Sequence, residues 1–174
     1  MTGLAIKQIG YVVRDLEEAS GHWLGKTGCG PLMIMRDVEF EGWSFRGHPQ
    51  SVQFDIAFGQ LGDMMVEFIQ PHGEWPNVYG KAPPQASCSL HHHGFLVVNP
   101  ELAGKALDSE LVTAASISET AQLRYYDCRD TLGIFIELIS DTAETRAFFD
   151  LSEGAARDWD GTTDPLRTIA FKSA

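Results

Sequence analysis

Hydrophobic residues along the chain follow two alternating periods, one typical of strands and the other of helices. Residues 5–13 form an apolar, β-branched run that predicts a buried strand. Apolar residues then recur at helical spacing after Asp15, which is placed to cap a helix that should end near Gly25 or Gly28. Three further strand-like runs follow, at 32–40, 51–58 and 64–70.

The same order of elements returns in the second half of the chain. Residues 90–98 predict a strand, and Asn99-Pro100 predicts the start of a helix that runs through Leu111. The local sequences match as well, because QIGYVVRDLEEA resembles HHGFLVVNPELA and MMVEFIQ resembles IFIELIS. An internal repeat of this kind constrains the fold more strongly than any single propensity. Three short strands are predicted after the helix, at 112–117, 122–127 and 133–139.

The repeat predicts an α+β protein built from two β-α-β-β-β modules. The first module covers residues 1–70 and the second covers residues 90–140. The segment between them, 71–89, is rich in Pro, Gly and Ser and is predicted to be a linker. After the repeat, residues 141–174 form a C-terminal extension, with a short helix expected over 141–151 and a turn-rich tail.

Composition and charge exclude several classes of protein. The 174 residues are 44% hydrophobic and 21% charged, as in a globular domain, and no apolar stretch is long enough to span a membrane. A formal net charge of −11, with Lys and Arg scattered singly, disfavours nucleic acids and membrane surfaces as partners. Without a secretory signal or a CxxC motif, we expect a cytoplasmic protein with free thiols at Cys29, Cys88 and Cys128.

Aligning the two halves brings four polar residues into equivalent strand positions. Gln8 corresponds to His92, and Glu67 corresponds to Glu137. Side chains alternate across a strand, so the apolar neighbours of each glutamate should face the helices while the glutamate faces the other side. A lone carboxylate is expensive to bury in such apolar strands. Two glutamates at equivalent positions, with His and Gln at the other pair, indicate a shared cation.

The repeated β-α-β-β-β pattern with these four positions resembles the vicinal oxygen chelate superfamily, which includes glyoxalase I, methylmalonyl-CoA epimerase and extradiol dioxygenases. The resemblance covers about residues 5–140 and implies a cupped mixed sheet around a central metal site. It also implies the metal ligands, which would be Gln8, Glu67, His92 and Glu137. Their order is similar to that of the eukaryotic type of glyoxalase I, whereas QIGYVVRDLEEA and WDGTTDP look more like an epimerase-like branch with a C-terminal extension.

One imidazole, two carboxylates and one amide oxygen suit one divalent ion, with Zn, Mn, Co, Ni and Mg as the candidates. Gln8 replaces the second histidine of an O₂-activating ferrous site, which disfavours extradiol dioxygenase chemistry. The donor set fits a metal-dependent isomerase, epimerase or glyoxalase-type lyase. Such an enzyme moves a proton beside the carbonyl of a small molecule that chelates the metal through vicinal oxygens. Glu137 is the first candidate for the base and Glu67 the second.

Two other functions remain open from the sequence. A binding protein of the bleomycin-resistance type would sequester a small molecule without a metal, in a pocket with Trp43, Trp75 and Phe135 as aromatic walls. A structural oligomerisation protein would leave the strand glutamates unexplained.

The sequence also carries expectations for residues outside this set of four. His91 and His93 should point away from His92, because successive strand residues alternate, and their roles should be structural or interfacial.

A coenzyme A or glutathione conjugate would need a basic patch, for which the candidates are Arg36, Arg46, Arg124 and Arg129. The long linker, the tail and the resemblance together indicate a homodimer.

Overall fold

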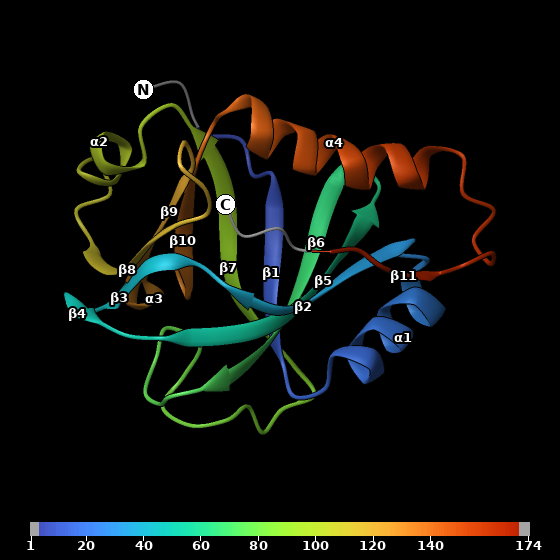
Figure 1. Ribbon diagram of the computed structural model, residues 1–174, viewed down its shortest axis with the longest axis horizontal. Helices are drawn as coiled ribbons and strands as arrows, with labels where there is room; N and C mark the ends of the chain where they lie inside the picture. The colour runs from blue at the N-terminus through green and yellow to red at the C-terminus, as the bar shows by residue number, and fades with distance from the viewer. Residues whose placement is uncertain (1–3, 171–174) are drawn as a thin grey trace.

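One curved mixed β-sheet, flanked by helices, forms the centre of the fold (Figure 1). The computed structural model describes residues 4–170. The helices are α1 (Leu16–Thr27), α2 (Pro100–Gly104), α3 (Arg129–Leu132) and α4 (Ala143–Arg157). The strands are β1 (Gln8–Val13), β2 (Leu32–Glu39), β3 (Glu41–Phe45), β4 (His48–Pro49), β5 (Val52–Leu61), β6 (Met64–Gly73), β7 (Cys88–Val97), β8 (Glu110–Ser116), β9 (Gln122–Cys128), β10 (Ile134–Ser140) and β11 (Leu166–Thr168).

The strand order shows the predicted repeat. It runs β11-β2-β5-β6-β1-β7-β10-β9-β8-β3-β4. β1 and β7 lie antiparallel at the centre, with β6 parallel to β1 on one side and β10 parallel to β7 on the other. Each half has the order strand, helix, strand, strand, strand once β3, β4 and α3 are set aside. The predicted α+β class with one large mixed sheet is confirmed.

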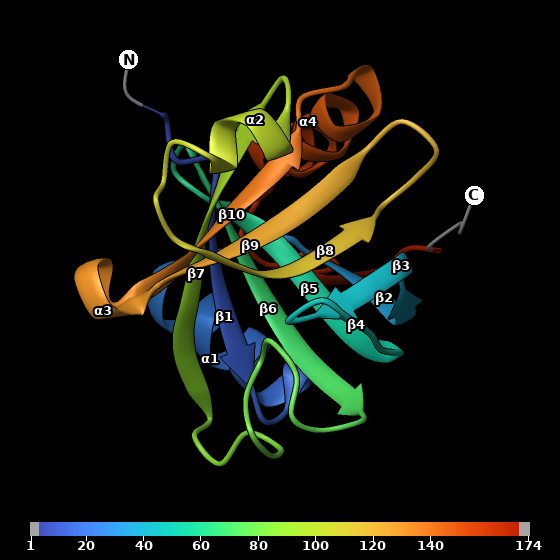
Figure 2. The same ribbon diagram turned by 90° about the vertical axis from the view of Figure 1, so that its left-hand side faces the viewer.

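The sheet curls until its two sides approach each other. β2 and β3 stand far apart in the strand order, yet only Phe40 separates them along the chain. β3 pairs with β8 of the second half, where Ser44 lies opposite Ala114. The chain therefore bridges the two sides of the sheet, and the inner face is partly enclosed (Figure 2).

Alternation along the strands divides the core between the two faces of the sheet. On the outer face, Val66 and Phe68 of β6 pack with α1, and Ile136 and Leu138 of β10 pack beside α2. This outward placement of the glutamates' neighbours confirms the prediction from strand alternation. The largest cluster lines the inner face, and Phe148 of α4 packs against it.

Local sequence signals set the ends of two helices. The Asp15 side chain accepts a hydrogen bond from the Glu18 backbone N–H at 2.8 Å and so caps α1. The helix ends at Gly28, whose φ of 72° lies in the left-handed region that glycine adopts without strain. At α4, Thr142 and Thr145 form a reciprocal capping box.

The prediction that the second helix runs through Leu111 is wrong, because the observed helix is shorter. α2 ends at Gly104, and β8 begins pairing with β9 at Glu110. Between them, Asp108 adopts a φ of 49°, which no helix residue has. The hydrogen bonds between β8 and β9 outweigh the helical spacing of the apolar residues. The local sequence pattern does not show that β9 is available as a pairing partner.

The C-terminal extension is more ordered than expected. The helix expected over 141–151 continues to Arg157, and the turn-rich tail adds strand β11, which pairs in parallel with β2. The β3–β4 hairpin was not predicted either, because its residues are half-exposed and lack strand alternation.

Two further expectations concern the environment of the chain. Within residues 4–170, no helix is both long and apolar enough to cross a membrane. The three cysteines are free thiols, as expected, with Cys29 and Cys128 buried and Cys88 half-buried.

Candidate active site

The register of the four central strands brings the predicted residues together on the inner face. Between β1 and β7, Gln8 lies opposite Gly94 and Gly10 lies opposite His92. The flanking parallel strands add Glu67 of β6 opposite Gly10, and Glu137 of β10 opposite Gly94. The pairing has the approximate twofold symmetry that the sequence repeat implies. The four polar side chains are all buried: Gln8, Glu67, His92 and Glu137.

Two glycines make room for these side chains. A Cβ atom on Gly10 would lie 1.8 Å from Cε1 of His92, which leaves no space for any side chain there. A Cβ atom on Gly94 would lie 3.1 Å from Cβ of Gln8 and 3.2 Å from Oε2 of Glu137. Gly10 and Gly94 stand at equivalent positions of the repeat, two residues after Gln8 and His92. Sequence reasoning missed them as site residues, although their shared place in the repeat is the signal that could have revealed them.

The His92 imidazole faces both glutamates of the site. Nε2 of His92 lies 3.1 Å from Oε2 of Glu137 and 3.5 Å from Oε2 of Glu67. Both His92 Nε2 and Glu137 Oε2 are buried, and neither has a partner that meets hydrogen-bond geometry. Burial alone would lower the pKa of His92, but the neighbouring charges of Glu137 and Glu67 raise it overall.

His91 points to the same site, so the expected opposite orientation is wrong. Gly10 pairs with His92 and Tyr11 with Leu90, which makes His91 an extra residue in a β-bulge. The bulge interrupts the alternation of β7. It turns the buried His91 ring toward His92, with the two Nδ1 atoms 3.1 Å apart.

The hydrogen bonds of His91 place a proton on Nδ1 of His92. Nε2 of His91 lies 3.0 Å from the carbonyl oxygen of Val78, which can only accept, so His91 carries its proton on Nε2. Burial lowers the pKa of His91 to about 3, so the ring is neutral and its Nδ1 is an acceptor. Nδ1–H of His92 is then the donor to that atom. Nε2 of His92 is therefore the ring nitrogen that faces Glu67 and Glu137.

The two carboxylates have different supporting groups. The Gln8 side chain is hydrogen-bonded to the Glu67 carboxylate, and the Tyr125 hydroxyl is hydrogen-bonded to Glu137. Burial raises the pKa of Glu67 to about 7, and the charge of Glu137 adds to this effect. Burial and the Glu137 charge hold the pKa of Tyr125 well above its usual range, so its hydroxyl stays protonated as a donor. The buried Tyr79 hydroxyl bonds Tyr125 in turn.

This arrangement fits a divalent cation, although the site is not complete as it stands. Among residues 4–170, no three His, Cys, Asp or Glu side chains by themselves form a metal-binding group. One imidazole nitrogen and two glutamate side chains nevertheless converge there. Oxygen and imidazole donors at about 2.0–2.2 Å from one ion lie roughly 3 Å apart, close to the observed distances. The bond from His91 resembles the outer support that orients metal-binding imidazoles.

A cavity of about 320 Å³ opens onto three of the four residues. Gln8, Glu67 and Glu137 contribute to its lining, while most of its other lining residues are apolar. Helix α4 covers one side, and Phe148 lies over Phe58 with the ring centroids 4.3 Å apart. The cavity is therefore a place where a small molecule could meet the carboxylates away from bulk water.

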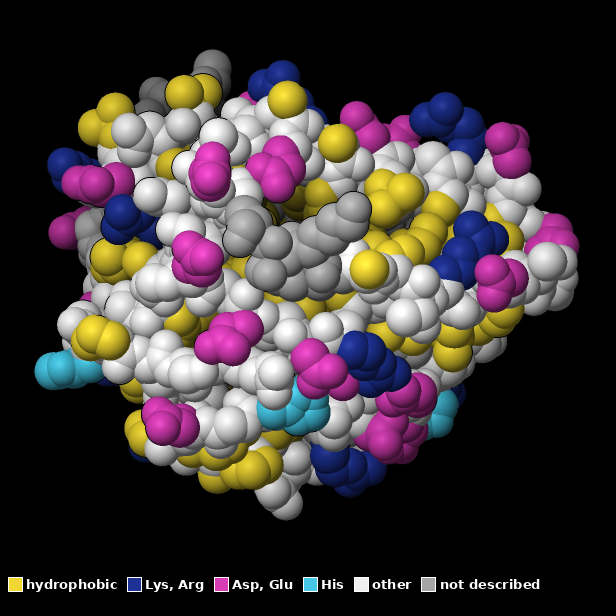
Figure 3. All heavy atoms as spheres, in the orientation of Figure 1, with side chains coloured by type: hydrophobic (Ala, Val, Ile, Leu, Met, Phe, Trp, Pro, Cys, Tyr) yellow, Lys and Arg dark blue, Asp and Glu magenta, His cyan; other side chains and the backbone are white. Residues whose placement is uncertain are grey.

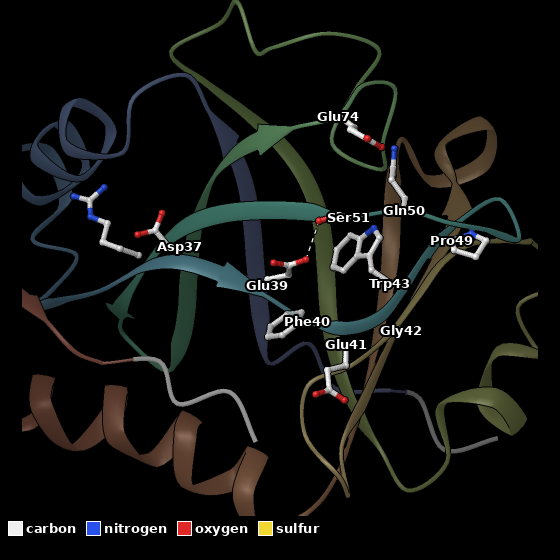
Figure 4. A pocket seen from close by; sticks show the side chains of 11 residues that line it. Asp37, Glu39, Phe40, Glu41, Gly42, Trp43, Pro49, Gln50, Ser51 and Glu74 are labelled. Carbon is white, nitrogen blue, oxygen red and sulfur yellow. Dashed lines mark hydrogen bonds between the residues drawn. The ribbon is translucent and has the colours of Figure 1, made fainter.

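A larger open groove, of about 880 Å³, lies along β2 and β3 (Figure 4). Its wall carries Asp37, Glu39, Glu41 and Glu74, and Ser51 donates to Glu39 within it at 2.8 Å. None of the four converging residues lines this groove. Trp43, expected as a wall of the binding pocket, lines this groove and not the 320 Å³ cavity, and most of its side chain is buried in the core with a half-buried Trp75 beside it.

The arginines considered for anion recognition already have acidic partners. Arg36 pairs with Asp55 and Glu17, and Arg46 pairs with Glu110. The other two pairs are Arg124 with Glu101 and Arg129 with Asp127. None of these four arginines lines the 320 Å³ cavity.

The fold and the matched part of the chain define the family. Residues 7–124 match the family model described as the Glyoxalase/Bleomycin resistance protein/Dioxygenase superfamily, and the chain belongs to this superfamily. The resemblance noted from the sequence is thereby confirmed.

Several solved structures with a similar fold are methylmalonyl-CoA epimerases at low sequence identity. Methylmalonyl-CoA epimerase from Mycobacterium tuberculosis is 15% identical with a TM-score of 0.53, and the match covers 84% of this chain and 95% of that one. A Streptomyces coelicolor methylmalonyl-CoA epimerase variant in complex with 2-nitronate-propionyl-CoA is 16% identical with a TM-score of 0.51, covering 81% and 100%. At this identity the likeness concerns the fold alone. No curated protein matches the chain in sequence.

Proposed function

We propose that this protein is a metal-dependent isomerase, epimerase or lyase that moves a proton next to a carbonyl group. Its substrate would chelate the metal through two vicinal oxygens. The observation that carries the proposal is the convergence of His92 Nε2 with the side chains of Glu67 and Glu137, at the edge of a small cavity. Membership of a superfamily that includes the epimerases among the similar structures supports it.

The residues that would hold the ion are Gln8, Glu67, His92 and Glu137, through one amide oxygen, one imidazole nitrogen and two carboxylates. When bound, a divalent ion supplies Lewis-acid polarisation of the substrate carbonyl, which makes the neighbouring C–H bond more acidic. The chain itself positions the donors: His91 orients the imidazole, and Gly10 leaves the space that the imidazole fills.

Glu137 is the proposed base, and Glu67 is the second candidate. The Tyr125 hydroxyl holds the Glu137 carboxylate in place, while the apolar cavity limits access of water to it. Glu137 would take the proton from the substrate carbon and return it to the opposite face or to the neighbouring carbon. Return to the opposite face gives epimerisation, and return to the neighbouring carbon gives isomerisation or a glyoxalase-type rearrangement.

Substitution of each carboxylate tests this assignment. Deuterium uptake from D₂O into 2-hydroxy carbonyl compounds is followed by NMR with the metal-loaded protein. Glu137→Gln keeps an oxygen donor and the side-chain volume but removes the base, so exchange should fall by roughly 10²- to 10⁴-fold. Glu144→Gln is the matched control, because this exposed residue lines the same cavity and should not alter exchange.

The outcomes separate the two roles. If Glu67→Gln abolishes exchange while Glu137→Gln retains it, the assignment of the base is reversed. If both variants keep the wild-type rate, proton transfer at this site is refuted.

A small-molecule binding protein without catalysis is the second candidate function. The apolar cavity and the lack of a finished three-residue metal group among residues 4–170 favour it. Thermal unfolding with several divalent ions in excess discriminates between the two, because an ion that binds only the folded chain raises the midpoint. If a divalent ion raises the unfolding midpoint of the wild type but not of His92→Ala, the result supports the metal-dependent enzyme. If no ion raises the midpoint, the result supports the binding protein.

A further inference from the structure

The cavity beside the four polar residues has a markedly apolar lining. Apart from Gln8, Glu67 and Glu137, most of the residues that line it are apolar, among them Ile56 and Leu123 on the inner face of the sheet. The remaining polar contributions among the described lining residues are few, and come from the start of α4. In Figure 3, hydrophobic side chains lie in the hollow beneath α4.

The described lining of the cavity has no positive charge to accompany a buried anion. None of the described residues that line it is Lys or Arg, whereas three of them are glutamates: Glu67, Glu137 and Glu144. An unpaired anion placed among such walls would lose its hydration without compensation. Any negative group of a substrate would have to lie at the metal or outside the cavity.

Helix α4 closes the cavity with side chains of the same character. Phe148 packs against Phe58, and Phe149 and Leu151 also line the space. Ser152 of the same helix is buried and its hydroxyl lies 3.4 Å from Gln60 Oε1 of β5, which fixes the helix on the sheet. The C-terminal extension thus adds an apolar wall that the two repeat modules do not provide.

We infer that the substrate has an uncharged, apolar body that fills this cavity while its chelating oxygens face Glu67 and Glu137. The volume of about 320 Å³ suits a body of two or three rings or a branched alkyl group. A phosphate-bearing carrier would lie outside. This inference rests on the proposed function, since it names the substrate class of the same site.

Two nearly isosteric fluorescent probes test the charge and polarity of the cavity. N-phenyl-1-naphthylamine is neutral, and 1-anilinonaphthalene-8-sulfonate adds one sulfonate to the same ring system. Titration of the metal-free full chain in EDTA should show at least tenfold tighter binding of the neutral probe. The ratio should persist at high salt, because screening removes the long-range repulsion of the net charge but not the local desolvation.

A charge placed at the cavity rim tests where the probes bind. Leu151 is 46% exposed on α4 and lines the cavity, so Leu151→Arg should fold and should narrow the affinity ratio by about two- to fivefold. Leu102→Arg is the matched control, because Leu102 is 66% exposed on α2 and does not line the cavity. Both variants change the net charge equally, and only the first should alter the ratio.

The results overturn or support the inference independently of catalysis. Equal binding of the two probes, no binding of the neutral probe, or equal effects of the two arginine variants would overturn it. Because the titration needs neither metal nor turnover, an absence of proton exchange would refute the proposed function and leave the binding result standing. Tight binding of the neutral probe, together with a narrower affinity ratio in Leu151→Arg but not in Leu102→Arg, supports the inference of an apolar substrate body.

Discussion

Gly10→Ala should disrupt the candidate site while leaving the rest of the fold in place. The added Cβ atom would lie 1.8 Å from Cε1 of His92 and 2.3 Å from both ring nitrogens. A relaxed carbon–carbon contact needs about 3.5–4 Å, so the ring has to move by roughly 2 Å. Gly10 has no left-handed φ, so the substitution strains no backbone angle and its cost comes from the imidazole.

The expected loss of stability follows from three contributions. Overpacking a filled core position costs about 1–3 kcal/mol. Moving His92, which is fully buried, also breaks its bond to His91, worth about 0.5–1.5 kcal/mol. Alanine in place of a strand glycine returns about 0.5–1 kcal/mol through the unfolded state. The sum is a loss of about 2 kcal/mol, together with a weaker affinity for divalent ions.

Urea unfolding of the metal-free chain, followed by tryptophan fluorescence, measures this loss. The midpoint should fall while the slope stays unchanged, because the same surface is exposed on unfolding. Gly25→Ala is the control: nothing lies within 4 Å of its added Cβ atom, and helix propensity should raise stability by up to about 1 kcal/mol.

A double-mutant cycle with His92→Ala decides whether the ring is responsible. Without the imidazole, Gly10→Ala should cost almost nothing, so the coupling should be about as large as the single-variant loss. An equal cost in both backgrounds would refute the steric reasoning. So would a wild-type midpoint for Gly10→Ala.

Three other perturbations have defined outcomes. His91→Phe removes the acceptor that orients His92 and should weaken divalent-ion affinity about 10- to 100-fold, measured by competition with a metallochromic dye. Tyr125→Phe removes the hydroxyl that holds Glu137 and should slow proton exchange roughly tenfold without altering neutral-probe binding; an unchanged rate contradicts its positioning role. Burial would raise the pKa of Asp55, but hydrogen bonds from the Asp37 backbone and Arg36 lower it overall. The contribution of Asp55 to the free energy of unfolding is therefore present above about pH 4 and is lost as pH falls through the pKa of the folded state. Asp55→Asn should therefore cost about 1–2 kcal/mol at pH 7 and progressively less below pH 4 in urea unfolding; a pH-independent cost contradicts this.

The geometry around His91 shows why strand alternation alone misled the prediction. Alternation assumes one residue for each position of the neighbouring strand, and the bulge in β7 adds one. Whether a bulge forms depends on pairing between β1 and β7, which lie about eighty residues apart in the chain. The conclusion that His91 orients His92 was therefore available only from the structure.

The sequence by itself determined the central strands and the residues that converge there. Because strand pairing repeats with the sequence repeat, the equivalence of Gln8 with His92 and of Glu67 with Glu137 was enough to place these four side chains on one face. Regular strands have a period of two, so a polar residue in an apolar strand is visible without coordinates.

Only the tertiary structure decided what surrounds those residues. Gly10 and Gly94 acquire their meaning from side chains on neighbouring strands, and the β2–β3 crossing encloses the inner face through pairing with β8. Helix α4 lies over the cavity, where Phe148 packs against Phe58, and these two residues are distant in the sequence. Local patterns report which face of an element is apolar, but the partner of that face is chosen by packing across the whole chain.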